Sequence, residues 1–325
     1  MAPWKRDKKK RERALRIFFA TDVHGSDRCF RKFLNAADAY DANVLVLGGD
    51  VAGKAIVPIR RSGDTLTAEI HGDLVSLPAA EKDKLVGDIN VMGFYAVEME
   101  DPEIERIGVD KPYLEGLFRR EIRAQLEGWC RLAGERLPAD VRCIITPGND
   151  DPMEIDAVLE SAEKVECPER ELCDLGPVLL ASIGDVTPTP WDTEREYSEE
   201  ELGQRIAAIV DPAPPDAKMI FNFHNPPYNS GLDTAAELDE NLRPVIRGGR
   251  PSFVPVGSKA VRDAIAKYQP TVGLHGHIHE SRAAQKIGQT LCLNPGSDYS
   301  ADLLRGVIVD LADDGSCVDF LLTAG

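Results

Sequence analysis

The sequence predicts an α/β layered fold. Short runs of four to six apolar residues recur without alternation along its 325 residues, which is typical of strands that are buried on both faces. Segments of helical periodicity lie between several of these runs, at residues 28–38, 199–209 and 257–267. Most runs lead directly into Gly, Asp or His, so we expect polar loops to gather at the carboxyl ends of the strands.

The predicted strands fall into two groups. Five runs are each followed directly by a polar motif, and they span residues 17–20, 44–47, 143–145, 219–223 and 271–274. The C-terminal stretch adds predicted strands at 291–293, 306–311 and 318–322, with a turn at 313–315. The candidate chemistry therefore lies at the ends of the first group.

Residues 54–111 do not follow this alternation and separate the second strand from the third. A connection of this length is usually either functional or a surface elaboration. Because it leaves the core directly after Asp50, the sharper interpretation is a cap over the site. We expect residues 16–325 to form one domain, in which 54–111 is an insertion or cap that folds back towards the loops carrying His224 and Arg247.

Three local elements are predicted within and after this insertion. Residues 61–64 have the composition of a hairpin turn between strands at 56–59 and 66–70. Residues 79–99 have a helical pattern, although two glycines weaken it. Residues 112–136 have a stronger amphipathic pattern, with a proline at the start, where a helix tolerates it.

The overall charge argues against some classes of partner. Lys and Arg number 38 against 55 Asp and Glu, which gives a formal net charge of −17. Such an acidic body disfavours broad non-specific binding to nucleic acid or to an anionic membrane. No apolar run approaches the roughly 20 residues of a membrane span. Residues 1–15 differ: this basic stretch is expected to be a flexible tail, or a weak contact with nucleic acid or an acidic partner.

Seven cysteines are scattered through the chain and form no C-x-x-C pair. An odd, unpatterned set is neither a disulfide framework nor a zinc ribbon. The N-terminus also lacks the apolar stretch of a secretory signal. We therefore expect reduced thiols and a cytoplasmic protein.

Asp, His and Asn residues follow the five runs of the first group. Asp22 and His24 are two positions apart, so in extended backbone their side chains would point the same way, and the same holds for His277 and His279. Carboxylate and amide oxygens mixed with imidazole nitrogens suit Mn²⁺, Fe²⁺, Co²⁺ or Zn²⁺ rather than a structural zinc. Seven donors exceed what one tetrahedral ion needs and fit two ions that share a carboxylate. The set is Asp22, His24, Asp50, Asn149, His224, His277 and His279.

The ordered motifs resemble those of the calcineurin-like metallophosphoesterase superfamily. They are D-x-H at 22–24, G-D at 49–50, G-N-x at 148–150, a lone His224, and G-H-x-H at 276–279. The resemblance covers residues 16–53 and 140–300. It implies a two-layered β-sandwich flanked by helices, with an insertion after the second strand, and the activity of a metal-dependent phosphoesterase.

The resemblance also implies a role for each donor. Asp22, His24 and His279 would hold one ion, Asn149, His224 and His277 would hold a second, and Asp50 would bridge the two. A hydroxide held between the ions would attack phosphorus in line, while the ions neutralise charge on the phosphoryl oxygens. Two divalent ions would let an acidic protein hold an anionic substrate.

The sequence departs from the superfamily at Asp150. In many members a histidine follows the Asn of the G-N motif and helps to protonate the leaving group. Asp150 is the catalytic candidate here, either as a general acid or as an ionised group that orients a ligand or a water. A carboxylate is a poor acid at neutral pH unless its pKa is raised. Asp151 would raise the pKa of Asp150, but the ions would lower it more, so we expect Asp150 to be ionised.

The stretch after His224 supplies candidates for substrate binding. Arg247 and Arg250 could bind a substrate phosphate, and Tyr228 could stack on a base. The alternative is a solvated basic loop.

A small phosphodiester or a nucleotide is the expected substrate, because the histidine acid is missing and the insertion could narrow the site. One alternative is a nuclease of the same superfamily that acts on DNA or RNA, with the basic tail as a strand guide. Another is a non-catalytic binding scaffold. The expected partner is a small phosphorylated molecule and not a membrane, while the sequence defines neither the metal nor an oligomeric state.

Overall fold

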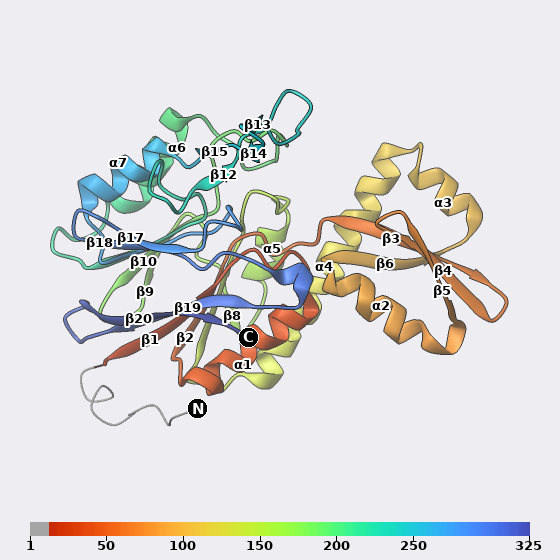
Figure 1. The fold of residues 1–325 in the computed structure, drawn as a ribbon. Coiled ribbons are helices and arrows are strands. Elements are labelled where there is room, and N and C mark those ends of the chain that lie inside the picture. The colour runs from red at the N-terminus through yellow and green to blue at the C-terminus, as the bar shows by residue number, and fades with distance from the viewer. Residues whose placement is uncertain (1–12) are drawn as a thin grey trace.

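The computed structural model describes residues 13–325, so the predicted tail at 1–15 falls almost wholly outside the described residues. Two six-stranded sheets lie face to face as a sandwich, with helices on the outer faces and a separate lobe at one side (Figure 1). The predicted fold class, a two-layered β-sandwich flanked by helices, is confirmed.

The first sheet has a parallel centre and one antiparallel edge. Strands β1, β2, β7 and β8 run parallel, β19 pairs antiparallel with β1, and β20 pairs antiparallel with β19. Across the sheet the order is β20 (Cys317–Ala324), β19 (Arg305–Leu311), β1 (Leu15–Ala20), β2 (Val44–Gly48), β7 (Arg142–Thr146) and β8 (Val165–Glu166). The carboxyl ends of β1, β2 and β7 therefore meet at one edge of the sandwich.

The second sheet repeats this plan with antiparallel strands at both edges. Strands β10, β11, β16 and β18 run parallel, whereas β17 and β9 pair antiparallel with their neighbours. Across the sheet the order is β17 (Ala283–Ile287), β18 (Thr290–Asn294), β16 (Val272–Leu274), β11 (Met219–Phe223), β10 (Leu179–Ile183) and β9 (Leu172–Asp174).

Burial on both faces explains why the strands do not alternate in polarity. In β1, Ile17 and Phe19 point into the space between the sheets, where they join Ile220 of the second sheet in one apolar cluster. The alternate residues Phe18 and Ala20 belong to another cluster, on the outer face of the same sheet. Each central strand thus has an apolar partner on either side.

Helices cover the two outer faces. The outer face of the first sheet packs against residues of α1 (Asp27–Tyr40), α4 (Lys111–Arg136) and α5 (Ile155–Glu160). The second sheet packs against α6 (Glu199–Val210) and α7 (Lys259–Tyr268). These segments confirm the helices predicted at 28–38, 112–136, 199–209 and 257–267.

The insertion has a sheet and a core of its own. Its strands lie in the order β5 (Asp73–Pro78), β4 (Thr65–Ile70), β3 (Ala55–Ser62) and β6 (Phe94–Met99). The predicted hairpin at 61–64 is confirmed as the β3–β4 turn. The lobe also contains the short helix η2 (Ala79–Glu81) and the helices α2 (Lys82–Val91) and α3 (Asp101–Ile107). Its apolar cluster combines residues of β3 and β4 with Leu85 and Ile89 of α2.

The prediction of one helix over 79–99 is wrong in its second half. Helix α2 ends at Val91, and the chain turns at Gly93, which has a φ of 77°. Residues 94–99 then pair parallel with β3. The aromatic Phe94 and Tyr95 and the β-branched Val97 favour a strand, and the glycine allows the turn that separates it from the helix.

The body of the insertion stands beside the sandwich (Figure 1), and its expected fold-back towards the loops carrying His224 and Arg247 stays a prediction. Its base is joined closely to the core. The Lys54 N–H donates to the Gly93 carbonyl at 2.8 Å, and the Gly53 N–H donates to the Tyr95 hydroxyl at 2.8 Å. The Tyr95 ring lies 5.6 Å, centroid to centroid, from Phe118 of α4. The base of the lobe is thus the part that approaches the strand ends, and a capping role stays a prediction.

Four short strands form an arm after β11. In this arm β12 (Thr234–Ala236) pairs with β15 (Phe253–Pro255), and β13 (Ile246–Arg247) pairs with β14 (Arg250–Pro251). The short helix η3 (Tyr299–Ala301) follows β18. Within residues 13–325, no helix is long and apolar enough to cross a membrane.

Candidate metal centre

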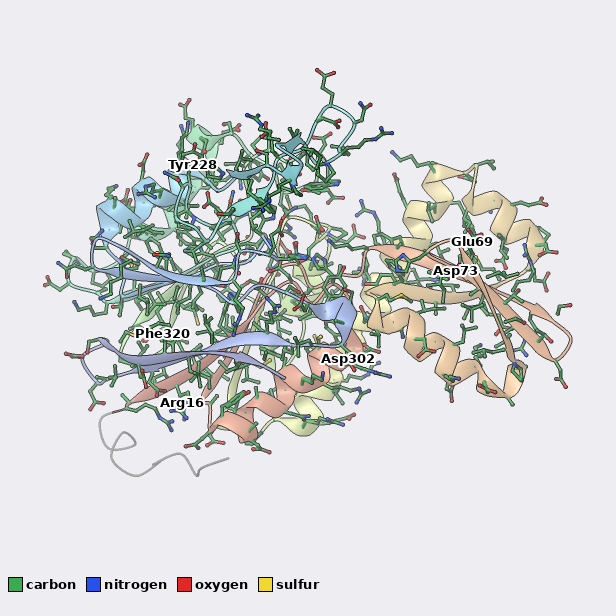
Figure 2. All side chains as sticks on the ribbon, viewed as in Figure 1. Arg16, Glu69, Asp73, Tyr228, Asp302 and Phe320 are labelled. Carbon is green, nitrogen blue, oxygen red and sulfur yellow. The ribbon has the colours of Figure 1, made fainter. Side chains whose placement is uncertain are left out.

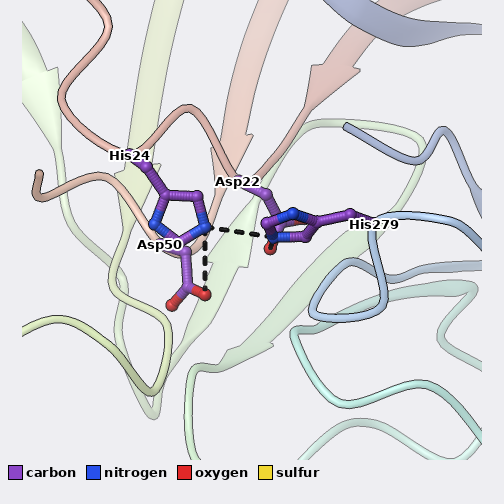
Figure 3. A group of neighbouring side chains, drawn as sticks. All are labelled: Asp22, His24, Asp50 and His279. Carbon is purple, nitrogen blue, oxygen red and sulfur yellow. Dashed lines mark hydrogen bonds and ion pairs between the residues drawn. The ribbon is translucent and has the colours of Figure 1, made fainter. Parts of the chain in front are cut away.

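The carboxyl ends of five strands bring the predicted donors together. In the first sheet, β1 leads into Asp22 and His24, β2 into Asp50, and β7 into Asn149. In the second sheet, β11 leads into His224 and β16 into the segment with His277 and His279. Four of these side chains converge from three different segments (Figure 3).

Two groups of side chains each offer donor atoms close enough to surround one cation. Asp22, His24, Asp50 and His279, called the first donor group here, place one donor atom each within 4.8 Å of the others. Asp50, His224 and His277, the second donor group, do the same. Asp50 belongs to both groups and is 2% exposed.

The first donor group is compact. The Nε2 atoms of His24 and His279 lie 3.1 Å apart, and His24 Nε2 lies 3.7 Å from Asp50 Oδ2 (Figure 3). Asp22 Oδ1 lies 3.4 Å from His279 Nε2. Two imidazole nitrogens and two carboxylates therefore point at one small volume, a donor set suited to a divalent transition metal.

The second donor group has a histidine in a defined orientation. His224 Nδ1 lies 3.0 Å from the Gly48 carbonyl, which can only accept, so Nδ1 carries the hydrogen. His224 Nε2 lies 3.3 Å from Asp50 Oδ2. A backbone carbonyl that fixes the tautomer in this way is the usual outer partner of a metal-binding histidine.

Buried polar atoms without hydrogen-bond partners also indicate that a cation binds between the donor groups. Within residues 13–325, His224 Nε2 and Asn149 Oδ1 are buried and make no hydrogen bond. Asn149 uses its other atom, Nδ2, to donate to Asp150 Oδ1 and Thr193 Oγ1. An unpaired buried acceptor costs about 1–3 kcal/mol, and a cation at this place would satisfy both atoms.

The electrostatics of the cluster favour a bound cation. Burial alone would raise the pKa of Asp22, but the facing imidazoles of His279 and His224 lower it to about 2. The charge of Asp50 and Asp22 overcomes burial and raises the pKa of His224 to about 10. Burial and the nearby His224 lower the pKa of His277 to about 4. The buried carboxylates of Asp22 and Asp50 thus carry negative charge that a bound cation would neutralise.

The expectation that Asp22 and His24 lie in extended backbone is wrong. Their φ values are 55° and 40°, and Asp50 has a φ of 52°, all in the left-handed region. The turn arises because the ends of β1 and β2 run side by side: the His24 N–H donates to the Asp50 carbonyl at 2.9 Å. Such conformations cost about 1–3 kcal/mol each and are concentrated at functional sites.

The glycines of the G-D and G-N motifs are required by lack of space. A Cβ on Gly148 would collide with Asp50 Oδ1 and lie 2.8 Å from His224 Nε2. A Cβ on Gly49, whose φ is 108°, would collide with His224 Nδ1 and lie 2.8 Å from His224 Cγ. Both glycines therefore let the two sheets bring their donors close together.

Asp150 lies beside the donors and contacts a residue that sequence reasoning missed. Its N–H donates to Asp50 Oδ1 at 3.0 Å, and its Oδ2 lies 3.3 Å from Lys54 Nζ and 3.9 Å from His24 Nδ1. Burial and the Asp50 carboxylate raise the pKa of Asp150 to about 6, although Lys54 opposes the rise. In the sequence, the feature that could have pointed to Lys54 is its position four residues after the donor Asp50.

Asp151 is not among the main causes of the raised pKa of Asp150. Its carboxylate accepts N–H groups of Val51, Ala52 and Gly148, at 2.7 to 3.1 Å. Asp50 is the carboxylate that raises the pKa of Asp150. Asp151 instead fixes the loops that carry Asp50 and the G-N motif.

The three candidates for substrate binding lie on the segments that follow β11. Tyr228 lies on the side of α6 and α7, where Lys259 Nζ is 5.5 Å from its ring (Figure 2). Arg247 lies on the arm and donates to Glu237 at 2.7 Å, and Arg250 is exposed beside it. None of these contacts reaches the donor groups, so a role of the three residues in substrate binding stays a prediction.

Comparison with known proteins agrees with this picture. No family model matches the chain. The uncharacterized protein MJ1162 of Methanocaldococcus jannaschii is 33% identical over 175 residues, which are 52% of this chain and 71% of that protein. The solved structure of TT1561 of Thermus thermophilus has a TM-score of 0.53 at 15% identity, over 96% of this chain and 98% of that one. A further solved structure has a TM-score of 0.57 at 14% identity, over 95% of this chain and 98% of that one.

At such identities the solved structures show the fold alone. The two solved structures therefore share the arrangement of this chain over almost its whole length. By sequence, the chain belongs to the same family as MJ1162 of Methanocaldococcus jannaschii.

Proposed function

We propose that the chain is a hydrolase that cleaves a phosphate ester with the help of two divalent metal ions. The observation that carries the proposal is the pair of donor groups that share Asp50. Asp22, His24 and His279 would hold one ion, Asn149, His224 and His277 the second, and Asp50 both. Mn²⁺, Fe²⁺, Co²⁺ and Zn²⁺ all suit this mixture of oxygen and nitrogen donors.

When bound, the ions would neutralise charge on a phosphoryl group and lower the pKa of a water. The chain's own residues orient the reacting groups. The Gly48 carbonyl fixes the tautomer of His224, and the His277 N–H holds the Asp22 carboxylate at 3.0 Å. The Ser297 hydroxyl donates to the Asp22 carbonyl at 2.7 Å. These contacts hold the donors in position before a substrate arrives.

We infer that the substrate is a small phosphodiester or a nucleotide. Asp150, in the place of the usual histidine, is held by Lys54 and by its own N–H to Asp50. The pKa of about 6 applies without metal ions, and bound ions would lower it. An ionised Asp150 paired with the Lys54 ammonium would then position groups and not donate a proton. We place the protein in the cytoplasm, since all seven cysteines are free thiols.

Replacing Lys54 with methionine is expected to lower kcat/KM for phosphodiesters about 10- to 100-fold, because the ammonium is a fixed cation beside an anionic substrate.

Asp150→Asn should lower kcat/KM by less than about tenfold. Proton donation by a positioned group is worth about 10²–10⁴-fold in rate, and we expect that Asp150 does not donate a proton. Steady-state kinetics with Mn²⁺ measures both effects.

The matched control is Lys84→Met, a lysine on α2 whose side chain is 63% exposed. It should leave kcat/KM unchanged. Metal content should be the same in all variants. A collapse of activity in Asp150→Asn together with a flat dependence on leaving-group pKa would make Asp150 the general acid.

The experiment that tests the proposed function is a substrate panel with Mn²⁺. It compares bis-p-nitrophenyl phosphate, p-nitrophenyl phosphate, cyclic nucleotides and a short oligonucleotide. We expect hydrolysis of the small diesters, abolished by a chelator. Preference for the oligonucleotide, with a log affinity that falls linearly with log salt, would favour a nuclease. Absence of turnover together with absence of bound metal would favour a scaffold.

A further inference from the structure

The loop between β10 and α6 presents a large aromatic side chain to solvent. Trp191 is 63% exposed and lies in the sequence Thr-Pro-Thr-Pro-Trp-Asp-Thr, residues 187–193. The burial of a tryptophan removes about 150–250 Å² from water. An exposed indole on an ordered loop thus leaves a large apolar area available to a ligand.

Both ends of this loop are bonded to segments that carry donors. The Asn225 side-chain amide, next to His224, donates to the Thr187 hydroxyl at 3.0 Å. The Asn149 side-chain amide donates to the Thr193 hydroxyl at 3.2 Å. The loop therefore borders the side of the centre formed by Asn149 and His224.

Internal hydrogen bonds hold the loop in one shape. The Glu196 carboxylate accepts from the N–H and the hydroxyl of Thr189 and from the N–H and the hydroxyl of Thr193, at 2.6 to 2.9 Å. The Trp191 N–H donates to the Thr189 hydroxyl at 3.2 Å. Two prolines fix φ on the N-terminal side of the tryptophan. The backbone that carries the indole is therefore ordered before a ligand packs on the ring, which lowers the entropy cost of binding.

The far end of the loop is anchored in the core. Arg195 is fully buried and donates to the Asp151 carbonyl at 2.9 Å. Glu194 accepts from the Met153 N–H at 2.9 Å and from Arg119 of α4 at 2.7 Å. The exposed Trp191 is therefore part of a built structure that surrounds the G-N motif, and not the tip of a loose loop.

Trp191 lies two residues before Thr193, which is bonded to a donor residue. Two residues of chain span at most about 7 Å, and Thr193 is in hydrogen-bond contact with Asn149. An organic group attached to a phosphate at the centre would lie within reach of the indole.

We propose that Trp191 is a specificity-determining residue whose indole stacks on the base of a nucleotide substrate bound at the metal centre. This inference rests on the proposed function and names the substrate class. A planar base is the fitting ligand because stacking on an aromatic ring needs no hydrogen-bond partner from the chain. A second aromatic side chain, that of Phe253 on β15 of the arm, is 58% exposed and provides the control for the experiment below.

Two substrates that share a leaving group test the inference. Thymidine 5′-(p-nitrophenyl phosphate) carries a base on its second ester group, and methyl p-nitrophenyl phosphate does not. Trp191→Ala should raise KM for the thymidine ester about tenfold or more and change kcat less than about threefold, because stacking on one base is worth this much. KM for the methyl ester should change less than about twofold.

Two variants complete the kinetic test. Trp191→Phe keeps an aromatic face and should restore most of the affinity for the thymidine ester. Phe253→Ala is the matched control and should behave as the wild type. An equal change in KM for both esters, or a change in neither, would overturn stacking on the base even if hydrolysis is normal.

A binding measurement separates this inference from the proposed function. Of the three tryptophans, Trp129 is 4% exposed, and Trp4 lies outside the described residues. Thymidine 5′-monophosphate should quench the intrinsic fluorescence of the wild type and should not quench that of Trp191→Phe. If neither ester is hydrolysed but this difference remains, the proposed function fails and the nucleotide site stands. If the nucleotide quenches both proteins equally, or neither, the nucleotide site is contradicted.

Discussion

The Asp50→Ala protein is expected to bind fewer than about 0.5 divalent ions per chain, against about two in the wild type, and to lose phosphoesterase activity. Asp50 belongs to both donor groups, so its removal weakens both sites together. Its carboxylate lies 3.7 Å from His24 Nε2 and 3.3 Å from His224 Nε2. We expect kcat/KM to fall at least about 10³-fold, about 4 kcal/mol of transition-state stabilisation.

Metal analysis of the purified protein and turnover of bis-p-nitrophenyl phosphate measure the two effects. Asp211→Asn is the control, since this aspartate pairs with Tyr268 and Lys267 on the surface. It should keep both ions and full activity. An Asp50→Ala protein that retains half the wild-type turnover would show that Asp50 is not the shared donor.

Gly148→Ala is expected to be the second most damaging change, although it removes no donor. The added methyl group would collide with Asp50 Oδ1 and lie 2.5 Å from the Asp50 N atom and 2.8 Å from His224 Nε2. Two of these atoms belong to the backbone or to a fully packed ring, so the loop itself must shift. Displacement of a reacting group by about 1 Å can cost about 10²-fold in rate, and we expect a loss of this size with weaker metal binding.

Gly116→Ala is the matched control for this change. Gly116 is exposed on α4, and a Cβ there would meet nothing within 4 Å. Alanine favours a helix over glycine by about 0.8–1.0 kcal/mol, so the control should be slightly more stable and fully active. Wild-type kinetics for Gly148→Ala would show that the close approach of the two sheets does not matter for function.

The sandwich could be predicted because its signals are local in the sequence. Runs such as 17–20 and 219–223 have apolar residues at alternate positions of both kinds, so each strand can be buried on both faces. In the structure these residues pack into clusters on the two faces of a sheet. The clustering of Asp and His side chains at one edge could be predicted for a related reason, since each lies within a few residues of the end of a strand. The secondary structure of the insertion was harder to predict. Residues 79–99 combine a helix with a strand whose partner, β3, is distant in sequence.

The remaining features depend on contacts between distant segments. The left-handed turns at Asp22 and His24 arise because β1 and β2 end side by side, and no residue near position 22 indicates this. Lys54 approaches Asp150 because the insertion begins at the strand edge. The loop that carries Trp191 borders the centre because Thr187 and Thr193 bond to two other loops. Such placements follow from tertiary packing and not from local periodicity.

Titration of the chelator-treated protein with Mn²⁺ tests the account most directly. Turnover of bis-p-nitrophenyl phosphate should be absent without metal, rise with added Mn²⁺ and reach a plateau at about two ions per chain, as the two donor groups that share Asp50 require. Full turnover after chelation, or a protein that binds no Mn²⁺, would contradict the account.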